Sequence, residues 1–200
     1  MSGMATSASG AAGLILAAGE SRRMGSPKPL LRYAGETFLD TLIALFAARC
    51  SPVVAVLGCA APEIRAGIRR GATFVVNPNW RRGQTTSLQC GLRAVPAGAA
   101  GVLFTLVDHP AVAPATLDVL LRGDPSALVR VPRHDGRRGH PIWFSSRLIP
   151  EFLALPEGAA ARDVVRAHAA ETEWIDVPDA GILADIDDLE AYRALAGAQP

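Results

Sequence analysis

The stretch that decides the fold is Gly13-Leu-Ile-Leu-Ala-Ala-Gly19-Glu-Ser-Arg-Arg-Met-Gly25-Ser-Pro-Lys28-Pro-Leu-Leu31. Its apolar start, Gly13–Ala18, predicts a buried strand, and Gly19 lets the chain turn sharply where that strand ends. Backbone N–H groups exposed in such a turn bind anionic oxygens. The stretch therefore predicts an anion-binding loop at the carboxyl end of a strand.

Short apolar runs alternate with amphipathic stretches along the rest of the chain. Further strands are expected at Val53–Leu57, Thr73–Val76, Val102–Val107, Ala127–Val131, Pro141–Phe144 and Trp174–Val177. Helices are expected at Phe38–Arg49, Pro62–Arg70, Thr86–Val95, Pro114–Arg122, Ala159–Ala170 and Asp188–Ala196. Continuous apolar strands separated by helices indicate an α/β fold, three-layer α/β/α and Rossmann-like, with a mostly parallel sheet. We expect residues 11–197 to form one domain after a disordered lead-in, residues 1–10.

The composition argues against several classes of protein. A formal net charge of +1 disfavours a nucleic-acid-binding protein, which would show a basic face or tail. Cys50, Cys59 and Cys90 are odd in number and lack CxxC spacing, so neither a disulfide framework nor a zinc site is expected. Cysteines of this kind favour a cytoplasmic location. The sequence contains no apolar run near the roughly 18 residues that a membrane span needs.

Three cations follow the opening strand: Arg22, Arg23 and Lys28. Lys28 is the only lysine among 20 lysines and arginines. A compact ammonium suits one oxygen of a crowded phosphate better than the broad guanidinium fork does, so the loop predicts a triphosphate site. The spacing of Gly19, Gly25 and Lys28 matches neither a Walker A loop nor the Gly-x-Gly-x-x-Gly motif of dinucleotide-binding proteins. Alternatively, the loop after the opening strand is a solvated surface turn.

Acidic residues occupy two later positions that fit a metal site. Asp108 comes directly after the expected strand Val102–Val107, where ligands of α/β proteins bind and where a carboxylate can hold Mg²⁺. Alternatively, Asp108 caps the helix that follows. Asp185 and Asp187 alternate onto one side of an extended segment, and either is a candidate for the second carboxylate. The alternative for this pair is an acidic start to the last helix. His109 is either a substrate contact or a packing residue.

Two polar, glycine-containing loops complete the candidate site. The segment Asn77–Leu88 leads into a helix, and its Gly83 and Ser87 are placed to approach a base or ribose. The segment Arg133–Pro141 joins two expected strands, and its basic residues suit an anionic second substrate. The histidines and the aspartate of this second loop are a weaker candidate for metal ligands.

The segment Leu16–Leu31 resembles the signature of the MobA-like nucleotidyltransferases. Asp108-His-Pro, Gly139-His-Pro141 and Asp185-Ile-Asp187 follow in the family's order, so the resemblance covers nearly the whole chain. Within the family, the sequence most resembles the MocA-type molybdenum cofactor cytidylyltransferases, which carry Leu-Ala-Ala-Gly and Gly-His-Pro. Uridylyl- and thymidylyltransferases also carry Leu-Ala-Ala-Gly. The implied fold is that of the nucleotide-diphosphosugar transferases.

The resemblance implies transfer of CMP from CTP to the terminal phosphate of molybdopterin, with release of pyrophosphate. Arg23, Lys28 and Asp108 would be the catalytic residues, and Asp108 would hold Mg²⁺ together with Asp187 or Asp185. The implied nucleotide-binding residues are Leu16, Ala17, Ala18, Gly19, Arg22, Arg23, Lys28, Gly83 and Ser87. The implied acceptor-facing residues are His109, Gly139, His140 and Pro141. His109 departs from the family, which often has Gln there.

Two other functions stay open on the sequence alone. One is nucleotidyl transfer from another donor such as GTP, or to another phosphorylated acceptor such as a sugar or alcohol phosphate. The other is non-catalytic binding of a nucleotide or cofactor. The expected partners are small-molecule substrates, with a molybdoenzyme or its chaperone as the candidate protein partner. Neither a nucleic acid nor a membrane is expected.

Overall fold

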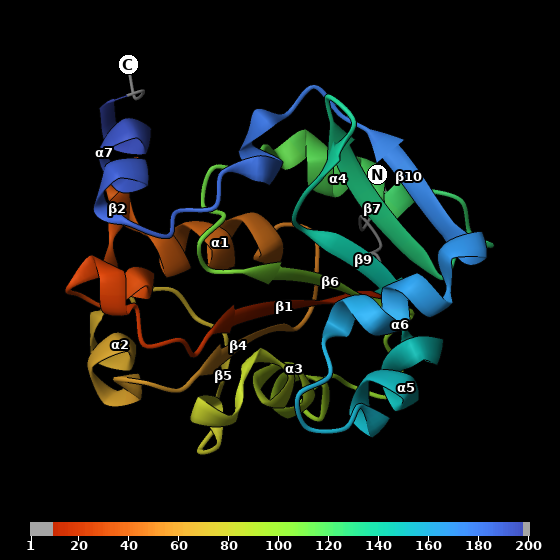
Figure 1. Ribbon diagram of the computed structural model, residues 1–200, viewed down its shortest axis with the longest axis horizontal. Helices are drawn as coiled ribbons and strands as arrows, with labels where there is room; N and C mark the ends of the chain where they lie inside the picture. Colours follow the sequence, from red (N-terminus) through yellow and green to blue (C-terminus); the bar gives the residue numbers. More distant parts are fainter. Residues whose placement is uncertain (1–9, 198–200) are drawn as a thin grey trace, which may run out of the picture.

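A computed structural model describes residues 10–197 of the chain, and Figure 1 shows its elements around a central sheet. The strands of this sheet are β1 (Ala11–Ala17), β4 (Val53–Leu57), β5 (Thr73–Val76), β6 (Gly101–Leu106), β7 (Val129–His134), β8 (Arg137–Arg138), β9 (Ile142–Ser145) and β10 (Thr172–Asp176). The order across the sheet is β10-β7-β9-β6-β1-β4-β5, with β8 paired to β7. Strands β6, β1, β4 and β5 run parallel, and β9 is antiparallel to both β6 and β7. The expected mostly parallel sheet is confirmed.

Helices cover both faces of the sheet. They are α1 (Phe38–Ala47), α2 (Ala61–Gly67), α3 (Gln84–Leu92), α4 (Pro114–Arg122), α5 (Ile149–Ala154), α6 (Ala161–Ala167) and α7 (Leu189–Gly197). Because successive strand side chains point to opposite faces, Ile15 of β1 packs in one core with α1 and α4, whereas Leu14 packs in another with α3, α5 and α6. Figure 1 shows α1 and α4 on one side of the sheet and α3 and α5 on the other. The expected three-layer α/β/α architecture is confirmed.

The packing of α1 fixes the position of β1, which leads into the candidate site. The helix begins after Thr37, whose hydroxyl accepts a hydrogen bond from Asp40 N at 3.0 Å, as expected of an N-cap residue. Phe46 then packs directly over Gly13 of β1. A Cβ at Gly13 would lie 2.8 Å from Phe46 Cδ1, so this close approach of helix and strand requires glycine.

Local details differ from the expectations in ways that have physical causes. The short pair β2 (Arg32–Tyr33) and β3 (Glu36–Thr37) was not expected, because strands of two residues leave no readable alternation. Helix α5 was also missed, since six residues with Pro150 in the first turn are too short to show helical periodicity. Apart from Gly10, the expected lead-in, residues 1–10, lies outside the described residues. Within residues 10–197, every helix is too short or too polar to cross a membrane.

Candidate active site

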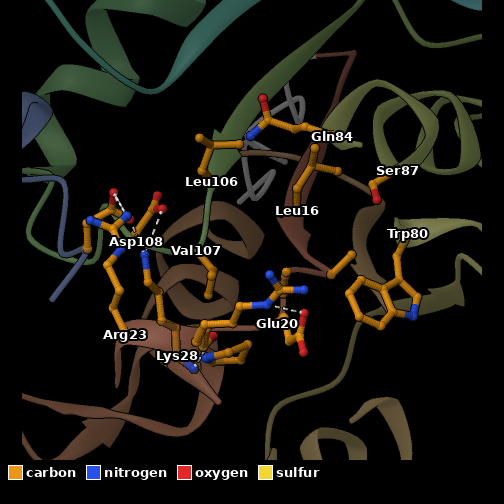
Figure 2. A pocket seen from close by; sticks show the side chains of 17 residues that line it. Leu16, Glu20, Arg23, Lys28, Trp80, Gln84, Ser87, Leu106, Val107 and Asp108 are labelled. Carbon is orange, nitrogen blue, oxygen red and sulfur yellow. Dashed lines mark hydrogen bonds and ion pairs between the residues drawn. The ribbon is translucent and has the colours of Figure 1, made fainter. Parts of the chain in front are cut away.

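A cleft of about 460 Å³ opens at the carboxyl ends of β1 and β6. Its walls come from the loop after β1, the start of α3, the end of β6 and one residue before α7. Figure 2 shows the side chains that line it. The lining residues are Leu16, Ala17, Ala18, Gly19, Glu20, Ser21, Arg22, Arg23, Lys28, Pro29, Trp80, Gln84, Ser87, Leu106, Val107, Asp108 and Asp187. The cleft therefore lies where ligands of open α/β sheets usually bind.

The loop after β1 is held in a compact shape by its own backbone. Arg22–Met24 forms a 3₁₀ turn between Ser21 and Gly25, both in the left-handed region, at φ 55° and 67°. Lys28 N donates a hydrogen bond to Ser21 Oγ at 2.9 Å, and Met24 is buried beneath the loop. Since glycine adopts a positive φ without strain, Gly25 is well suited to close this turn. The loop therefore presents its cations from a defined backbone.

Cations of this loop meet carboxylates from two distant parts of the chain. Lys28 Nζ lies 3.5 Å from Asp108 Oδ2 and also forms an ion pair with Asp187. Arg23 Nη2 donates to Asp187 Oδ2 at 2.6 Å. The hydrogen bond from Lys28 is the main cause that lowers the pKa of Asp187 below its ordinary value, and Arg23 adds to it. Asp187 therefore stays ionised and orients both cations.

The pKa of Asp108 moves in the opposite direction from that of Asp187. Burial raises the pKa of Asp108, and the charge of Lys28 offsets this only in part. The difference follows from geometry, because Lys28 is closer to Asp187 and the Asp108 side chain is only 17% exposed. Asp108 Oδ1 is buried and has no hydrogen-bond partner among residues 10–197. A buried oxygen without a partner is rare in proteins and fits a site that a cation completes.

A backbone hydrogen bond brings the segment before α7 to Asp108. Ile186 N donates to Asp108 O at 3.0 Å, so Asp185 and Asp187 flank the point of contact. Ligand atoms of Asp185, Asp108 and His109 lie within 4.8 Å of one another. Burial, followed by repulsion from Asp108, raises the pKa of Asp185. Both candidates for the second carboxylate are thus near Asp108, but they differ in their other partners.

Other acidic residues occupy the positions at helix starts that were the alternatives for Asp108, Asp185 and Asp187. Asp179, and not Asp108, anchors the start of α4, because its Oδ2 accepts from Ala113 N at 2.9 Å and from Thr116 Oγ1 at 2.6 Å. At the last helix, Asp188 Oδ1 accepts from Ala191 N at 2.9 Å. Asp108, Asp185 and Asp187 are therefore not explained as helix caps.

His109, which is buried, and His140, which is half-buried, form a pair beside the carboxylates. Their ring centroids are 5.0 Å apart. Burial lowers the pKa of His140 to about 3 and also lowers that of His109, so both rings are neutral at pH 7. Gly139 packs against the backbone of Ile182, where a side chain would collide. This segment therefore forms a tight wall behind His109.

A second cavity of about 310 Å³ is lined in part by His140. Its lining residues are Gln84, Phe104, Val131, Arg138, Gly139, His140, Ile142, Ala160, Ala161, Arg162, Val165 and Trp174. Gln84 lines both this cavity and the cleft after β1, so the two spaces are neighbours. The second cavity is mostly apolar with two arginines at its edge.

The structure brings most of the expected site residues together. Of the expected nucleotide-binding residues, only Gly83 lies off the cleft, in a neighbouring hollow with Asn77 and Arg82. Gly139 and His140 line the second cavity, whereas Pro141 is buried beside it. The second loop's candidate metal ligands, His134, Asp135 and His140, do not form such a group within residues 10–197.

Sequence reasoning missed Trp80 and Gln84 as parts of the cleft. Trp80 is half-buried and lies across the cleft from Lys28 and Asp108 in Figure 2. A Cβ at Gly58 would lie 2.7 Å from Trp80 Cβ, so glycine after β4 makes room for the indole. The sequence feature that could have predicted Trp80 in the cleft is an aromatic residue beside two arginines in Asn77–Gly83, because an aromatic ring can stack on a base while arginines bind its phosphates.

Comparisons with known proteins agree with this geometry. The molybdenum cofactor cytidylyltransferase of Escherichia coli (strain K12) is 30% identical over 181 residues, covering 87% of this chain and 89% of the relative. A probable molybdenum cofactor guanylyltransferase of Mycobacterium avium (strain 104) is 32% identical over 196 residues, covering 94% and 96%. The crystal structure of Rv0371c from Mycobacterium tuberculosis H37Rv superposes with a TM-score of 0.84 at 32% identity, covering 94% and 97%. A further structure of Rv0371c, in complex with manganese, gives a TM-score of 0.78 at 29% identity, covering 94% and 98%.

The family follows from the match over most of the sheet and from the cleft described above. The MobA-like NTP transferase domain matches residues 13–172, which include most of β1, the cation-bearing loop, Asp108 and the Gly139–Pro141 segment. Most of β10, the last carboxylates and α7 lie beyond the matched region. On this evidence, the chain belongs to the MobA-like NTP transferase family.

Proposed function

We propose that this protein transfers CMP from CTP to the terminal phosphate of molybdopterin and releases pyrophosphate. The observation that carries the proposal is the position of Lys28, a largely buried cation between Asp108 and Asp187 at the end of β1. A preformed cluster of this kind suits a metal-bound polyphosphate, because each cation can exchange a carboxylate for a phosphate oxygen.

The chain has little covalent chemistry to perform in this reaction. The acceptor phosphate is already ionised, so no strong base is needed to activate it. Lys28 and Arg23 hold the triphosphate and stabilise the charge that grows on the leaving pyrophosphate. Arg22, whose side chain is 80% exposed and paired with Glu20, can turn toward the outer phosphate. Catalysis then consists of positioning and charge neutralisation.

The acidic residues fit a divalent metal, for which Mg²⁺ is the expected ion. Asp108 offers a buried oxygen without a hydrogen-bond partner among residues 10–197, and Asp185 lies beside it. When bound, such an ion orients the phosphates and offsets charge in an in-line displacement. The manganese complex of Rv0371c supports a divalent ion in a related protein.

The two cavities suggest how the substrates are arranged. The backbone of Leu16–Gly19, with Ser87 and the nearby Gly83, would surround the base and ribose of CTP in the cleft. The second cavity, beside Gly139 and His140, would hold the acceptor. Because Gln84 lines both spaces, an acceptor phosphate at their junction would lie near the α-phosphate of the nucleotide.

Guanylyl transfer is the second candidate. Relatives described as cytidylyl- and guanylyltransferases are 30% and 32% identical to this chain, so similarity alone favours neither base. Cytosine is preferred here because Ala17 and Ala18 give the Leu-Ala-Ala-Gly form of the opening signature.

All three cysteines form no disulfide, which fits a cytoplasmic location. A molybdoenzyme or its chaperone would then collect the product.

A substrate panel tests the proposal directly. The protein is incubated with Mg²⁺, molybdopterin and each of CTP, GTP, UTP and ATP, while pyrophosphate release and product mass are followed. We expect pyrophosphate and a cytidine dinucleotide with CTP. A guanine dinucleotide would establish the second candidate instead. Tight binding of CTP without product from any nucleotide would contradict catalysis, and a parallel panel of sugar and alcohol phosphates tests other acceptors.

A further inference from the structure

Asp185 and Asp187 differ in whether other side chains already form ion pairs with their carboxylates. Asp187 is engaged by both Lys28 and Arg23. Asp185 forms no ion pair within residues 10–197, and its carboxylate points toward Asp108 and His109. Two cations already neutralise Asp187, so a metal ion gains less from it than from Asp185. Asp187 thus positions Lys28, whereas Asp185 is the carboxylate that can bind an ion with Asp108.

His109 supplies a third group at the same place. Its side chain is 7% exposed, and its ring makes no hydrogen bond within residues 10–197. His109 Nε2 lies 3.6 Å from Asp108 Oδ1, too far for a hydrogen bond but close enough for both atoms to bind one ion. Asp108 Oδ1 is buried without a hydrogen-bond partner among residues 10–197, and an ion bound beside His109 Nε2 would give this oxygen a partner.

The distances are compatible with one ion after a small adjustment. Atoms bound at about 2.1 Å to the same ion lie within roughly 4.2 Å of one another. The ligand atoms of Asp108, His109 and Asp185 already lie within 4.8 Å. Asp185 is exposed and lies outside regular secondary structure, so its side chain can move the remaining distance.

We propose that Asp108, His109 and Asp185 form a three-ligand metal site in which the imidazole of His109 contributes a nitrogen. Carboxylates and water suit Mg²⁺ and Mn²⁺, whereas imidazole adds affinity for first-row transition metals and little for Mg²⁺. The site therefore binds Mn²⁺ and Co²⁺ more tightly than Mg²⁺. The inference rests on the proposed function only in placing a divalent ion in the cleft.

Manganese bound to the full-length protein tests this assignment without any measurement of turnover. Pulsed electron paramagnetic resonance detects ¹⁴N coupling when an imidazole nitrogen is bound to Mn²⁺. We expect this coupling in the unsubstituted protein, with or without CTP, and its loss in His109→Gln. Mn²⁺ affinity should fall about tenfold or more in that variant. His134→Gln, which changes a histidine on β7 bonded to the backbone of Val177, should keep both coupling and affinity.

Two further variants separate the carboxylates and protect the test from misfolding. Asp185→Asn should weaken Mn²⁺ binding about tenfold while Asp187→Asn keeps the ¹⁴N coupling. If His109→Gln fails to fold by circular dichroism, the coupling in the unsubstituted protein and the Asp185 variant decide the matter. Absence of Mn²⁺ binding, absence of ¹⁴N coupling in the unsubstituted protein, or unchanged coupling in folded His109→Gln would overturn the proposal. If ¹⁴N coupling is present but no turnover is found, the proposed nucleotidyl transfer is rejected and the metal site is kept. If turnover is found without ¹⁴N coupling, the metal site is rejected and nucleotidyl transfer is kept.

Discussion

Lys28 Nζ lies 3.5 Å from Asp108 Oδ2, although the two residues are 80 positions apart in the chain. Their side chains are only 12% and 17% exposed. The contact joins the loop after β1 to the end of β6, and the neighbouring β1 and β6 set its geometry. Because a buried ion pair loses much of its hydration, this pair is more readily explained by a charged ligand than by stability.

Replacing Lys28 tests whether its charge acts in the transition state. Lys28→Ala should lower kcat at least about a hundredfold, because one preorganised charge donor contributes about 3 kcal/mol. Pyrophosphate release at saturating CTP and molybdopterin measures the effect. Arg70→Ala, which removes a cation that pairs with Glu36 and does not line the cleft, serves as the control. A Lys28→Ala enzyme with near-normal kcat would remove this residue from the mechanism.

Asp108 should be indispensable for metal-dependent turnover. Asp108→Ala removes a carboxylate that faces Lys28 and carries a buried oxygen without a partner among residues 10–197. We expect Mg²⁺-dependent pyrophosphate release to disappear across a full Mg²⁺ titration. Asp118→Ala, on α4 and paired with Arg49, should titrate like the unsubstituted protein. An unchanged Mg²⁺ dependence in Asp108→Ala would exclude this carboxylate as a ligand.

Much of this site could be predicted because its parts lie directly after strands. Gly19 and Asp108 follow buried runs whose ends are readable from hydrophobicity alone, and parallel strands place those ends at one edge. The ion pairs of Lys28 could not be predicted, since Asp185 and Asp187 are equivalent by alternation. The hydrogen bond from Ile186 N to Asp108 O brings both carboxylates near Asp108, and the ion pairs with Lys28 and Arg23 distinguish Asp187 from Asp185. Trp80 was missed because its approach depends on Gly58, a tertiary contact.

The paired His109 and His140 should make stability depend on pH. The pKa of His140 is lowered to about 3 by burial, and that of His109 is also lowered. Between the ordinary value of 6.5 and about 3, the unfolded chain binds a proton at His140 that the folded chain does not. The free energy of unfolding should therefore fall as pH drops below 6.5, by up to about 1.4 kcal/mol per pH unit for each such group.

Urea unfolding at a series of pH values from 7.5 to about 4.5 measures this dependence. His140→Gln removes one of the two groups and should flatten the slope. A slope that is equal in His140→Gln and in the unsubstituted protein would show that other groups cause it.

Trp80 should contact the bound nucleotide. The indole lies across the cleft from Lys28 and Asp108 (Figure 2), which is where a base would lie when its phosphates meet the cations. Binding of CTP should therefore quench tryptophan fluorescence. The quench should vanish in Trp80→Phe and persist in Trp174→Phe, because Trp174 lines the second cavity and not this cleft. Since stacking of a base on an aromatic ring contributes about 1–3 kcal/mol, Trp80→Ala should weaken CTP binding by about tenfold or more in calorimetry. If Trp80→Ala binds CTP as tightly as the unsubstituted protein, the base lies elsewhere, and the cleft holds the triphosphate without this contact.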